Sequence, residues 1–360
     1  MSGYKQLQTV SFFIMIATLP AIGLADSQSM RKLSIEEIKK FTCGAFQVIK
    51  KDKNIEFQRF CPKLQDYFKT NPTFDIRAKC TTGIVIRFAS DTSFLKIKAK
   101  IVPKSPATGQ IDILSNNKPI TSLHTNLKNG LLDAVVPITS ENNEMNIIEI
   151  YLPHYSVCYI NEIFIEKKSG LSAAPLQDIL LAFGDSITQG GGAYGPSQTA
   201  VSIAARQNNL SICNFGVGGY FFDANSLICE QAIEPRYIIV AFGTNDWSLG
   251  KSPNNARDYL NKLRAIFPHT KIIILEPLFR FRPDTDGANN AVNKNKITLS
   301  EYRAQLAQLV SEFDNMICVP PSRLLKFDKD LLSDGVHPTG EGYIQFGTNI
   351  GQILKTIFDE

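Results

Sequence analysis

Hydrophobic residues in the first half of the chain, from about Leu33 to Lys168, mostly recur at every second position, and turn residues separate the runs. A period of two predicts β-strands. The predicted strands are GIVIRFA from residue 83, FLKIKAKIV from 94, DAVVPI from 133, MNIIEIYLP from 145 and VCYINEIFIE from 157. A short helical stretch, SIEEIKKFTCGAF, precedes them. Many short strands without intervening helices predict an antiparallel, jelly-roll-like β-sandwich.

One of these strands carries a row of lysines. Lys96, Lys98 and Lys100 alternate with apolar residues, so the strand has one polar and one apolar face. We interpret the lysine row as a solvated face of the sheet that also discourages pairing at a sheet edge, and not as a binding patch.

The pattern changes after a polar segment of small residues, KKSG followed by SAAP, which ends at Pro175. Beyond it, short and nearly continuous apolar runs are typical of parallel strands covered on both faces. These runs are DILLAF, LSICNFGV, RYIIVAFGTN, KIIILEPLF and NMICVP. Helical stretches alternate with them: SPNNARDYLNKLRAIF, ITLSEYRAQLAQLVSEF and GEGYIQFGTNIGQILKTIF. We therefore expect a sandwich over 30–170 and a doubly wound, three-layer α/β/α domain over 175–360, with ligands at the carboxyl ends of its strands.

The first residues predict export. Lys5 precedes an apolar segment from Val10 to Ala25, which ends in a small-x-small pattern and is shorter than the roughly 20 residues that span a bilayer. We expect a signal peptide over 1–25, cleaved near Ala25, and a secreted or periplasmic mature protein without a membrane span. An uncleaved membrane anchor is the alternative.

Charge and cysteine content exclude some classes of function. The net charge is only +4 with both signs intermixed, so we expect no nucleic-acid partner. The seven cysteines form no CxxC pair and no Cys/His group at metal-ligand spacing, so neither zinc nor another cofactor is expected. We interpret the cysteines mainly as buried thiols that pack as small apolar residues; after export some could pair, most plausibly among Cys43, Cys61 and Cys80.

Candidate chemistry begins at Ser186, which follows the first strand of the α/β domain in LLAFGDSITQGGG. A serine nucleophile needs a base, and the base is usually histidine. His124 and His154 lie in the β-rich region, and His269 precedes a strand at the opposite edge of the sheet. Elimination leaves His337, in the loop that opens the last helix.

The residues around His337 support this choice. Asp334 precedes it by three residues across a turn that contains glycine, close enough to accept the second imidazole hydrogen. Donors for a developing oxyanion are available at two further strand ends, in the glycines of NFGVGGY and in Asn245 of AFGTNDW. Together these residues predict acyl transfer.

Two other motifs fit the glycines poorly. Gly190, Gly192 and Gly195 match GxGxxG, but the match begins several residues beyond the strand, and no acid ends the next strand where a dinucleotide's ribose would bind. The GxSxG elbow of α/β-hydrolases fails because Thr188 stands where glycine is required.

Four segments in order, GDSIT, NFGVGG, GTND and DGVHP, resemble the GDSL or SGNH hydrolase family over residues 178–358. The resemblance implies a serine esterase with Ser186 as nucleophile, His337 as base and Asp334 as its orienting partner. It implies an oxyanion hole formed by the N–H of Ser186, the N–H of Gly219 and the side chain of Asn245; Gly218 is the alternative to Gly219. Asp185 and Asp246 are interpreted as hydrogen-bond partners that shape the loops.

The order of a sandwich followed by GDSIT is similar to the two-domain members of the family, such as the family 2 carbohydrate esterases. This similarity implies a short-chain, acetyl-type ester on a small molecule or polysaccharide as substrate. Tyr220 and Trp247 are candidates for a substrate wall, with core packing an equal alternative for the aromatic run that begins at Tyr220. Arg280 and Arg282 are candidates for binding an acidic substrate group, although a solvated loop is the simpler interpretation of the two arginines. An acyltransferase with the same site and an inactive carbohydrate-binding surface protein are the alternatives.

Overall fold

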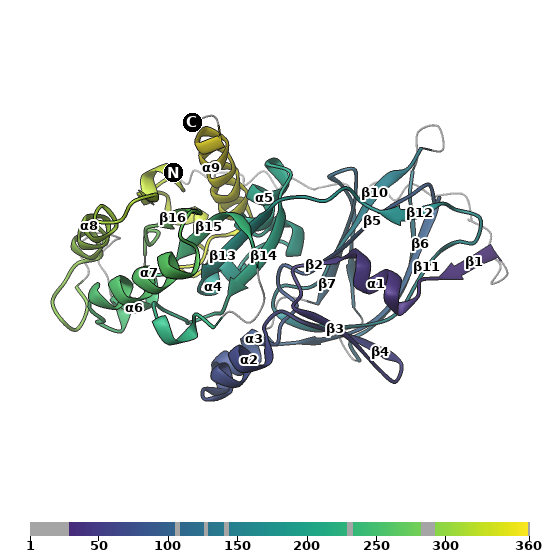
Figure 1. Cartoon of the computed structure of the whole chain (residues 1–360), viewed down its shortest axis with the longest axis horizontal. Coiled ribbons are helices and arrows are strands. Elements are labelled where there is room, and N and C mark those ends of the chain that lie inside the picture. The colour runs from purple at the N-terminus through teal and green to yellow at the C-terminus, as the bar shows by residue number, and fades with distance from the viewer. Residues whose placement is uncertain are drawn as a thin grey trace, which may run out of the picture.

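The computed structural model describes residues 29–104, 109–125, 129–139, 144–228, 233–281 and 292–358. Figure 1 shows two regions side by side, a β-rich region built from the first half of the chain and an α/β region built from the second. The predicted signal peptide over 1–25 lies outside the described residues. No helix among those described is long and apolar enough to cross a membrane.

The β-rich region consists of two antiparallel sheets, as the period of two predicts. One sheet has the order β3 (Gln47–Lys51), β4 (Asn54–Gln58), β11 (Ser156–Glu166), β6 (Phe94–Pro103) and β9 (Leu131–Pro137), with β1 (Met30–Lys32) paired to β11. The other has the order β12 (Leu171–Ala173), β5 (Val85–Ser90), β10 (Asn146–Tyr151), β7 (Gln110–Ser115) and β8 (Lys118–His124), with β2 (Thr42–Cys43) paired to β5. Side chains from both sheets, such as Ile97 and Ile113, form one fully buried apolar core. The helix α1 (Ile35–Phe41) begins at a capping box of Ser34 and Glu37.

Several details of this region differ from the prediction. Two helices, over Pro62–Lys69 and Pro72–Ala78, interrupt the strands that were expected to follow one another without helices, and β3, β4 and β8 were not predicted. The lysine row lies on β6, which pairs with β11 and β9 and is therefore an inner strand, so the expected protection of a sheet edge is wrong. Instead Lys98 forms an ion pair with Glu162 at 2.9 Å. The strand β7 was not predicted although Ile111 and Ile113 alternate with the polar Gln110 and Asp112, and all four side chains are buried.

The α/β region contains a five-stranded parallel sheet with the order β14, β13, β15, β16, β17. The strands are β13 (Ile179–Gly184), β14 (Ser211–Gly216), β15 (Pro235–Ala241), β16 (Lys271–Leu275) and β17 (Met316–Val319). Helices α7 (Asn254–Ile266) and α8 (Leu299–Val310) pack on one face, and α5 (Ala200–Gln207) and α9 (Gly340–Phe358) on the other. The strand order reverses at β13, and such a point is where doubly wound sheets bind ligands. The short helices α4 (Ser186–Gln189) and α6 (Thr244–Ser248) follow β13 and β15.

The two regions share a core. Helices α2 (Pro62–Lys69) and α3 (Pro72–Ala78) belong to the first half of the chain, but their buried residues Leu64, Phe68 and Ala78 lie in one cluster with Phe183 and Val217 of the α/β region. Figure 1 shows this helical pair where the two regions meet. The first region is therefore packed against the strand ends of the second, and is not a detached module.

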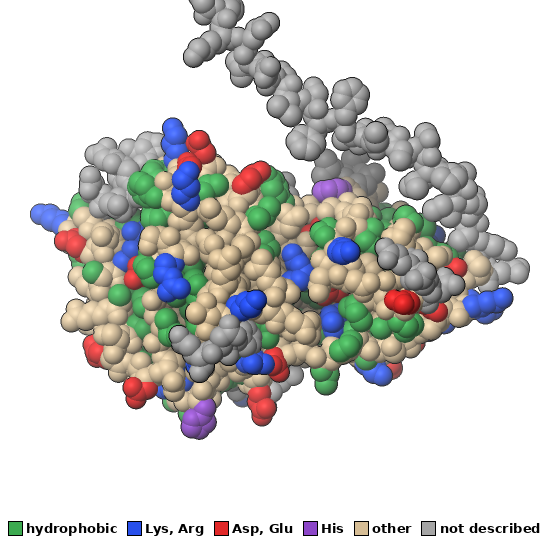
Figure 2. Space-filling view, turned by 90° about the horizontal axis from the view of Figure 1, so that it is seen from above, with side chains coloured by type: hydrophobic (Ala, Val, Ile, Leu, Met, Phe, Trp, Pro, Cys, Tyr) green, Lys and Arg blue, Asp and Glu red, His purple; other side chains and the backbone are tan. Residues whose placement is uncertain are grey.

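The surface carries charges of both signs. Acidic and basic side chains are intermixed over the face that Figure 2 shows. Among the described residues, no disulfide joins any two of Cys43, Cys61 and Cys80, which agrees with the interpretation as buried thiols and not with the alternative pairing. Cys229 lies outside the described residues.

Candidate active site

Ser186 lies one residue beyond Asp185 at the end of β13 and begins α4. It is the one partly exposed residue between Leu180 and Gly190, where all the others are buried. The tight turn requires the glycine before it, because a Cβ at Gly184 would clash with the side chain of Thr188. The backbone therefore presents a single hydroxyl to the surface at the centre of the sheet edge.

His337 meets this hydroxyl from the loop between β17 and α9. Its Nε2 lies 2.7 Å from Oγ of Ser186, and its Nδ1 lies 2.9 Å from Oδ2 of Asp334. Oδ1 of Asp334 accepts the backbone N–H of His337 at 2.8 Å and that of Val336 at 3.0 Å. Hydroxyl, imidazole and carboxylate thus form one hydrogen-bonded series, as a charge-stabilised serine nucleophile requires.

The electrostatics of Asp334 suit this arrangement. Partial burial alone would raise the pKa of the carboxyl, but the hydrogen bonds and charge of His337 outweigh it and lower the pKa to about 2. The carboxylate is therefore ionised at neutral pH and can hold the imidazole in one orientation.

Two backbone N–H groups are available for an oxyanion. Neither Ser186 nor Gly219 donates its N–H to any residue that the structure describes. The N–H of Gly218, in contrast, already donates to Oε1 of Gln189 at 2.8 Å. Between the two glycines considered from the sequence, the free donor is therefore on Gly219, which adopts a positive φ of 77°.

Asn245 lies at the start of α6, beyond β15, and its side-chain amide is already engaged. Nδ2 donates to the carbonyl oxygen of Tyr220 at 2.9 Å and, more weakly, to Oδ2 of Asp185 at 3.3 Å. The longer of these contacts leaves one amide hydrogen that a stronger acceptor can capture. Three donors thus come from the carboxyl ends of three adjacent strands.

Asp185 and Asp246 shape the loops around these donors. Asp185 is buried and accepts the N–H of Ile187 at 2.9 Å, and Asp246 is buried and accepts the N–H of Phe222 at 3.2 Å. Burial raises the pKa of Asp185 to about 6 and that of Asp246 to about 7. Both contacts agree with the loop-shaping interpretation.

Replacing Asp246 with asparagine is expected to stabilise the protein at alkaline pH. The pKa of Asp246 is about 7 in the folded protein and 3.8 in an unfolded chain. Folding therefore favours the protonated carboxyl, so its contribution to the free energy of unfolding is fully present below pH 3.8 and is lost as the pH rises through 7. Asparagine keeps an acceptor for Phe222 without a charge, so the melting temperature should rise by roughly 3–6 °C at pH 8 and less at pH 4.5. Thermal unfolding of both proteins at the two pH values measures this; an equal gain at both would contradict it.

The described residues among those predicted to bind substrate are buried. Tyr220 and Trp247 are only 4% and 3% exposed and belong to the apolar core, so neither offers a free ring face. Arg280 is not in a solvated loop as expected: it is 9% exposed, with its guanidinium 5.0 Å from the centre of the Trp247 ring. Arg282 lies outside the described residues.

Several residues near Ser186 were not identified from the sequence. Buried Gln189 and Asn214 tie the loops together, and Asn214 Nδ2 donates to the carbonyl of Thr188 at 2.8 Å. The feature of the sequence that could have identified Gln189 and Asn214 is that each is a polar residue within or next to a motif segment. Tyr155 and Arg77 come from the first region, and the Tyr155 hydroxyl donates to the carbonyl of Ser186 at 3.3 Å. No sequence pattern connects these two residues with the motif segments.

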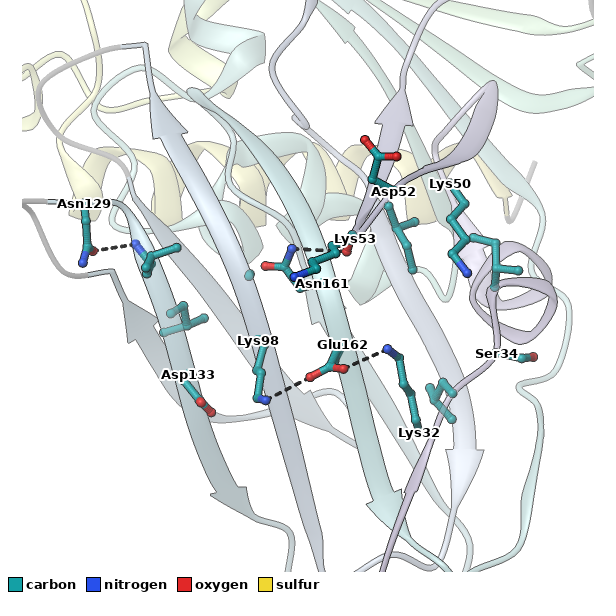
Figure 3. A pocket seen from close by; sticks show the side chains of 16 residues that line it. Lys32, Ser34, Lys50, Asp52, Lys53, Lys98, Asn129, Asp133, Asn161 and Glu162 are labelled. Atoms are coloured by element: carbon teal, nitrogen blue, oxygen red, sulfur yellow. Dashed lines mark hydrogen bonds and ion pairs between the residues drawn. The ribbon is translucent and has the colours of Figure 1, made fainter. Parts of the chain in front are cut away.

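A separate groove of about 1080 Å³ lies on the first sheet of the sandwich, and none of the predicted site residues lines it. Figure 3 shows Glu162 between Lys32 and Lys98 in this groove, each lysine 2.9 Å from the carboxylate. Glu162 is therefore shared by two lysines, and these three groups carry a net charge of +1.

Comparison with known proteins agrees with the geometry. Residues 182–344 match the model of the GDSL-like Lipase/Acylhydrolase family. This segment contains Ser186, Gly219, Asn245, Asp334 and His337. No curated protein sequence matches the chain.

Solved structures share the fold over nearly the whole chain. A salicylyl-acyltransferase from a tetracycline biosynthetic pathway superposes with a TM-score of 0.76 at 18% identity, covering 91% of this chain and 98% of its own. A family two carbohydrate esterase from Cellvibrio japonicus gives 0.59 at 16% identity, covering 92% and 98%. An acetyl xylan esterase from the rumen bacterium Butyrivibrio proteoclasticus gives 0.60 at 13% identity, covering 92% and 99%. At these identities the likeness establishes the two-region fold.

Proposed function

We propose that the second half of the chain, in which residues 182–344 match the GDSL-like lipase/acylhydrolase model, is a serine hydrolase acting on esters, and that the protein removes short acyl groups, acetyl above all, from carbohydrate esters. The observation that carries the proposal is the hydrogen-bonded series from Ser186 through His337 to Asp334. The substrate class is supported by two-region neighbours that are carbohydrate esterases.

The first step is attack by Oγ of Ser186 on the ester carbonyl. Nε2 of His337, 2.7 Å away, takes the hydroxyl proton, and Asp334 stabilises the imidazolium that forms. The N–H groups of Ser186 and Gly219 and the amide of Asn245 bind the oxyanion. The alcohol then leaves with the proton from His337.

The second step releases the acyl group. Water, activated by His337, attacks the acyl-Ser186 ester, and a second tetrahedral intermediate uses the same donors. When an acceptor alcohol replaces water, the same steps transfer the acyl group, and the acyltransferase among the structural neighbours makes this the second candidate function.

The proposal is tested with p-nitrophenyl acetate, butyrate and octanoate, followed by acetylated xylan and acetylated monosaccharides. Turnover should fall steeply with acyl length and should release acetate from the sugars. Product analysis with and without added alcohols separates hydrolysis from transfer. A folded protein that turns over no ester, with or without acceptors, would contradict the proposal and favour the inactive carbohydrate-binding alternative.

Asn245→Ala is expected to lower kcat for p-nitrophenyl acetate by roughly a hundredfold or more, because one of three oxyanion donors is lost. Asn245 is itself partly exposed, and the hydrogen bonds of its side chain that the structure describes go only to the Tyr220 carbonyl and Asp185, so the fold should persist. Steady-state kinetics and circular dichroism measure the two effects. Unchanged kcat would remove Asn245 from the oxyanion hole.

We also propose export through the segment over 1–25, which agrees with a polysaccharide substrate outside the cell. N-terminal sequencing of the protein recovered from its own cells tests cleavage near Ala25; an intact N-terminus would favour the membrane-anchored alternative.

A further inference from the structure

One cation from the first region reaches the proposed oxyanion hole. Arg77, on α3, is partly buried, and its Nη1 donates to the carbonyl oxygen of Gly218 at 2.5 Å. A Cβ built on Gly219 would lie 2.8 Å from the same Nη1, and one built on Gly218 would lie 3.1 Å from Nε. The guanidinium therefore lies directly against both glycines.

The carbonyl that Arg77 holds belongs to the same peptide group as the N–H of Gly219. In a trans peptide the C=O and N–H bonds point in opposite directions, and none of the described peptide bonds is cis. Fixing the carbonyl of Gly218 on one side therefore fixes the direction of the Gly219 N–H on the other. Glycine permits many backbone conformations, so without this contact the peptide group is free to rotate away.

The neighbouring contacts hold Arg77 itself in place. Gln189 accepts the N–H of Gly218 at 2.8 Å and donates Nε2 to the backbone carbonyl of Arg77 at 3.0 Å. The backbone and the side chain of Arg77 are thus both connected to the loop that follows β14. This connection joins α3 to the turn at Gly218 and Gly219.

The charge of Arg77 is not neutralised by an acid. Among the described residues no carboxylate pairs with Arg77, and its neighbour Arg59 is likewise bound only to carbonyl oxygens, including those of Asn214 and Gly216 at 2.9 Å. Two guanidinium groups thus lie behind one face of this loop without a counter-ion. Their field favours negative charge on the opposite face, where an oxyanion would develop.

We propose that Arg77 is a positioning residue of the active site: it aims and polarises the Gly218–Gly219 peptide group so that the Gly219 N–H donates to the oxyanion. This inference rests on the proposed function. It assigns the first region a direct part in the reaction, because the α/β domain's own described residues supply no cation at this peptide.

The test compares Arg77→Met with Arg264→Met. Arg264 also binds only backbone carbonyls, those of Phe267 and Asn315 among them, but at the amino ends of the strands. Arg77→Met should lower kcat for p-nitrophenyl acetate roughly 10–100-fold with little change in KM, and slow labelling of Ser186 by a fluorophosphonate by a similar factor. Arg264→Met should retain both rates, with any effect confined to the melting temperature.

Two further variants separate positioning from folding. Arg77→Lys keeps the charge and should recover part of the lost rate, and millimolar guanidinium should raise kcat of Arg77→Ala but not that of Arg264→Met. If the wild type is active and both Arg77→Met and Arg77→Lys keep its full kcat and labelling rate, this inference is overturned and the proposed function stands. A folded wild type that neither hydrolyses esters nor reacts with the fluorophosphonate would overturn the proposed function, and this inference with it.

Discussion

Ser186→Ala is expected to abolish ester hydrolysis, lowering kcat by roughly 10⁴–10⁶-fold. The reason is that Oγ of Ser186 is the nucleophile of the hydrogen-bonded series: among the described residues, it is the hydrogen-bond partner of His337 Nε2, at 2.7 Å. The change removes a single partly exposed hydroxyl, so the fold should be unaffected. Hydrolysis of p-nitrophenyl acetate and the melting temperature, measured side by side, separate the two effects.

The matched control is Ser311→Ala, which removes a hydroxyl that binds only the carbonyl of Gln308, at the end of α8. This variant should keep wild-type kcat. Residual turnover in Ser186→Ala above about one hundredth of wild type would mean that another group attacks the ester, and would remove Ser186 from the role of nucleophile.

Asp334→Asn should cause the second-largest loss, roughly 10³–10⁴-fold in kcat. The carboxylate accepts the Nδ1 hydrogen of His337 at 2.9 Å, whereas an asparagine amide nitrogen at this place favours the tautomer that carries its proton on Nε2. That tautomer cannot accept the proton of Ser186. Asparagine keeps the acceptor for the backbone N–H groups of Val336 and His337, so the loop itself should persist.

The dependence of kcat on pH distinguishes the wrong tautomer of His337 in Asp334→Asn from the simple loss of a negative charge. Because the His337 contacts lower the pKa of Asp334 to about 2, the carboxylate's contribution to stability is present above 3.8 and is lost only as the pH falls through 2. The defect of Asp334→Asn should therefore be similar at pH 6 and pH 9. Asp330→Asn, on an exposed residue of the same loop, is the control and should behave as wild type. A defect in Asp334→Asn that vanished at high pH would contradict the tautomer argument.

The segments that carry Ser186, Gly219 and Asn245 were predictable because each lies within a few residues of a strand end. The run that ends at Gly184 places Ser186 at the carboxyl edge of the sheet, and parallel strands bring the ends of β14 and β15 beside it. The spacing of Asp334 and His337 is local and follows from one turn. Hydrophobic patterning was therefore sufficient for the α/β fold and for placing Ser186 and Asn245 at strand ends, whereas the choice of His337 and Gly219 also needed elimination and the motif resemblance.

Long-range contacts could not be predicted in this way. Arg77 lies 141 positions before Gly218 in the chain, and nothing in its own segment indicates that α3 packs on the far region. The environment of Arg280 was also not predictable from its own segment. The polar sequence around Arg280 suggested a solvated loop, but packing against Trp247 buries its side chain. Residues whose environment is made by another segment need the tertiary structure.

The most direct test of the account is to treat the wild-type protein with a fluorophosphonate and to identify the modified peptide by mass spectrometry, with p-nitrophenyl acetate hydrolysis followed in the same sample. We predict a single adduct on Ser186, hydrolysis that is lost in proportion to it, and no adduct in Ser186→Ala. Hydrolysis that survives complete labelling of Ser186, or an adduct on another residue that accompanies its loss, would contradict the assignment of Ser186 as the nucleophile.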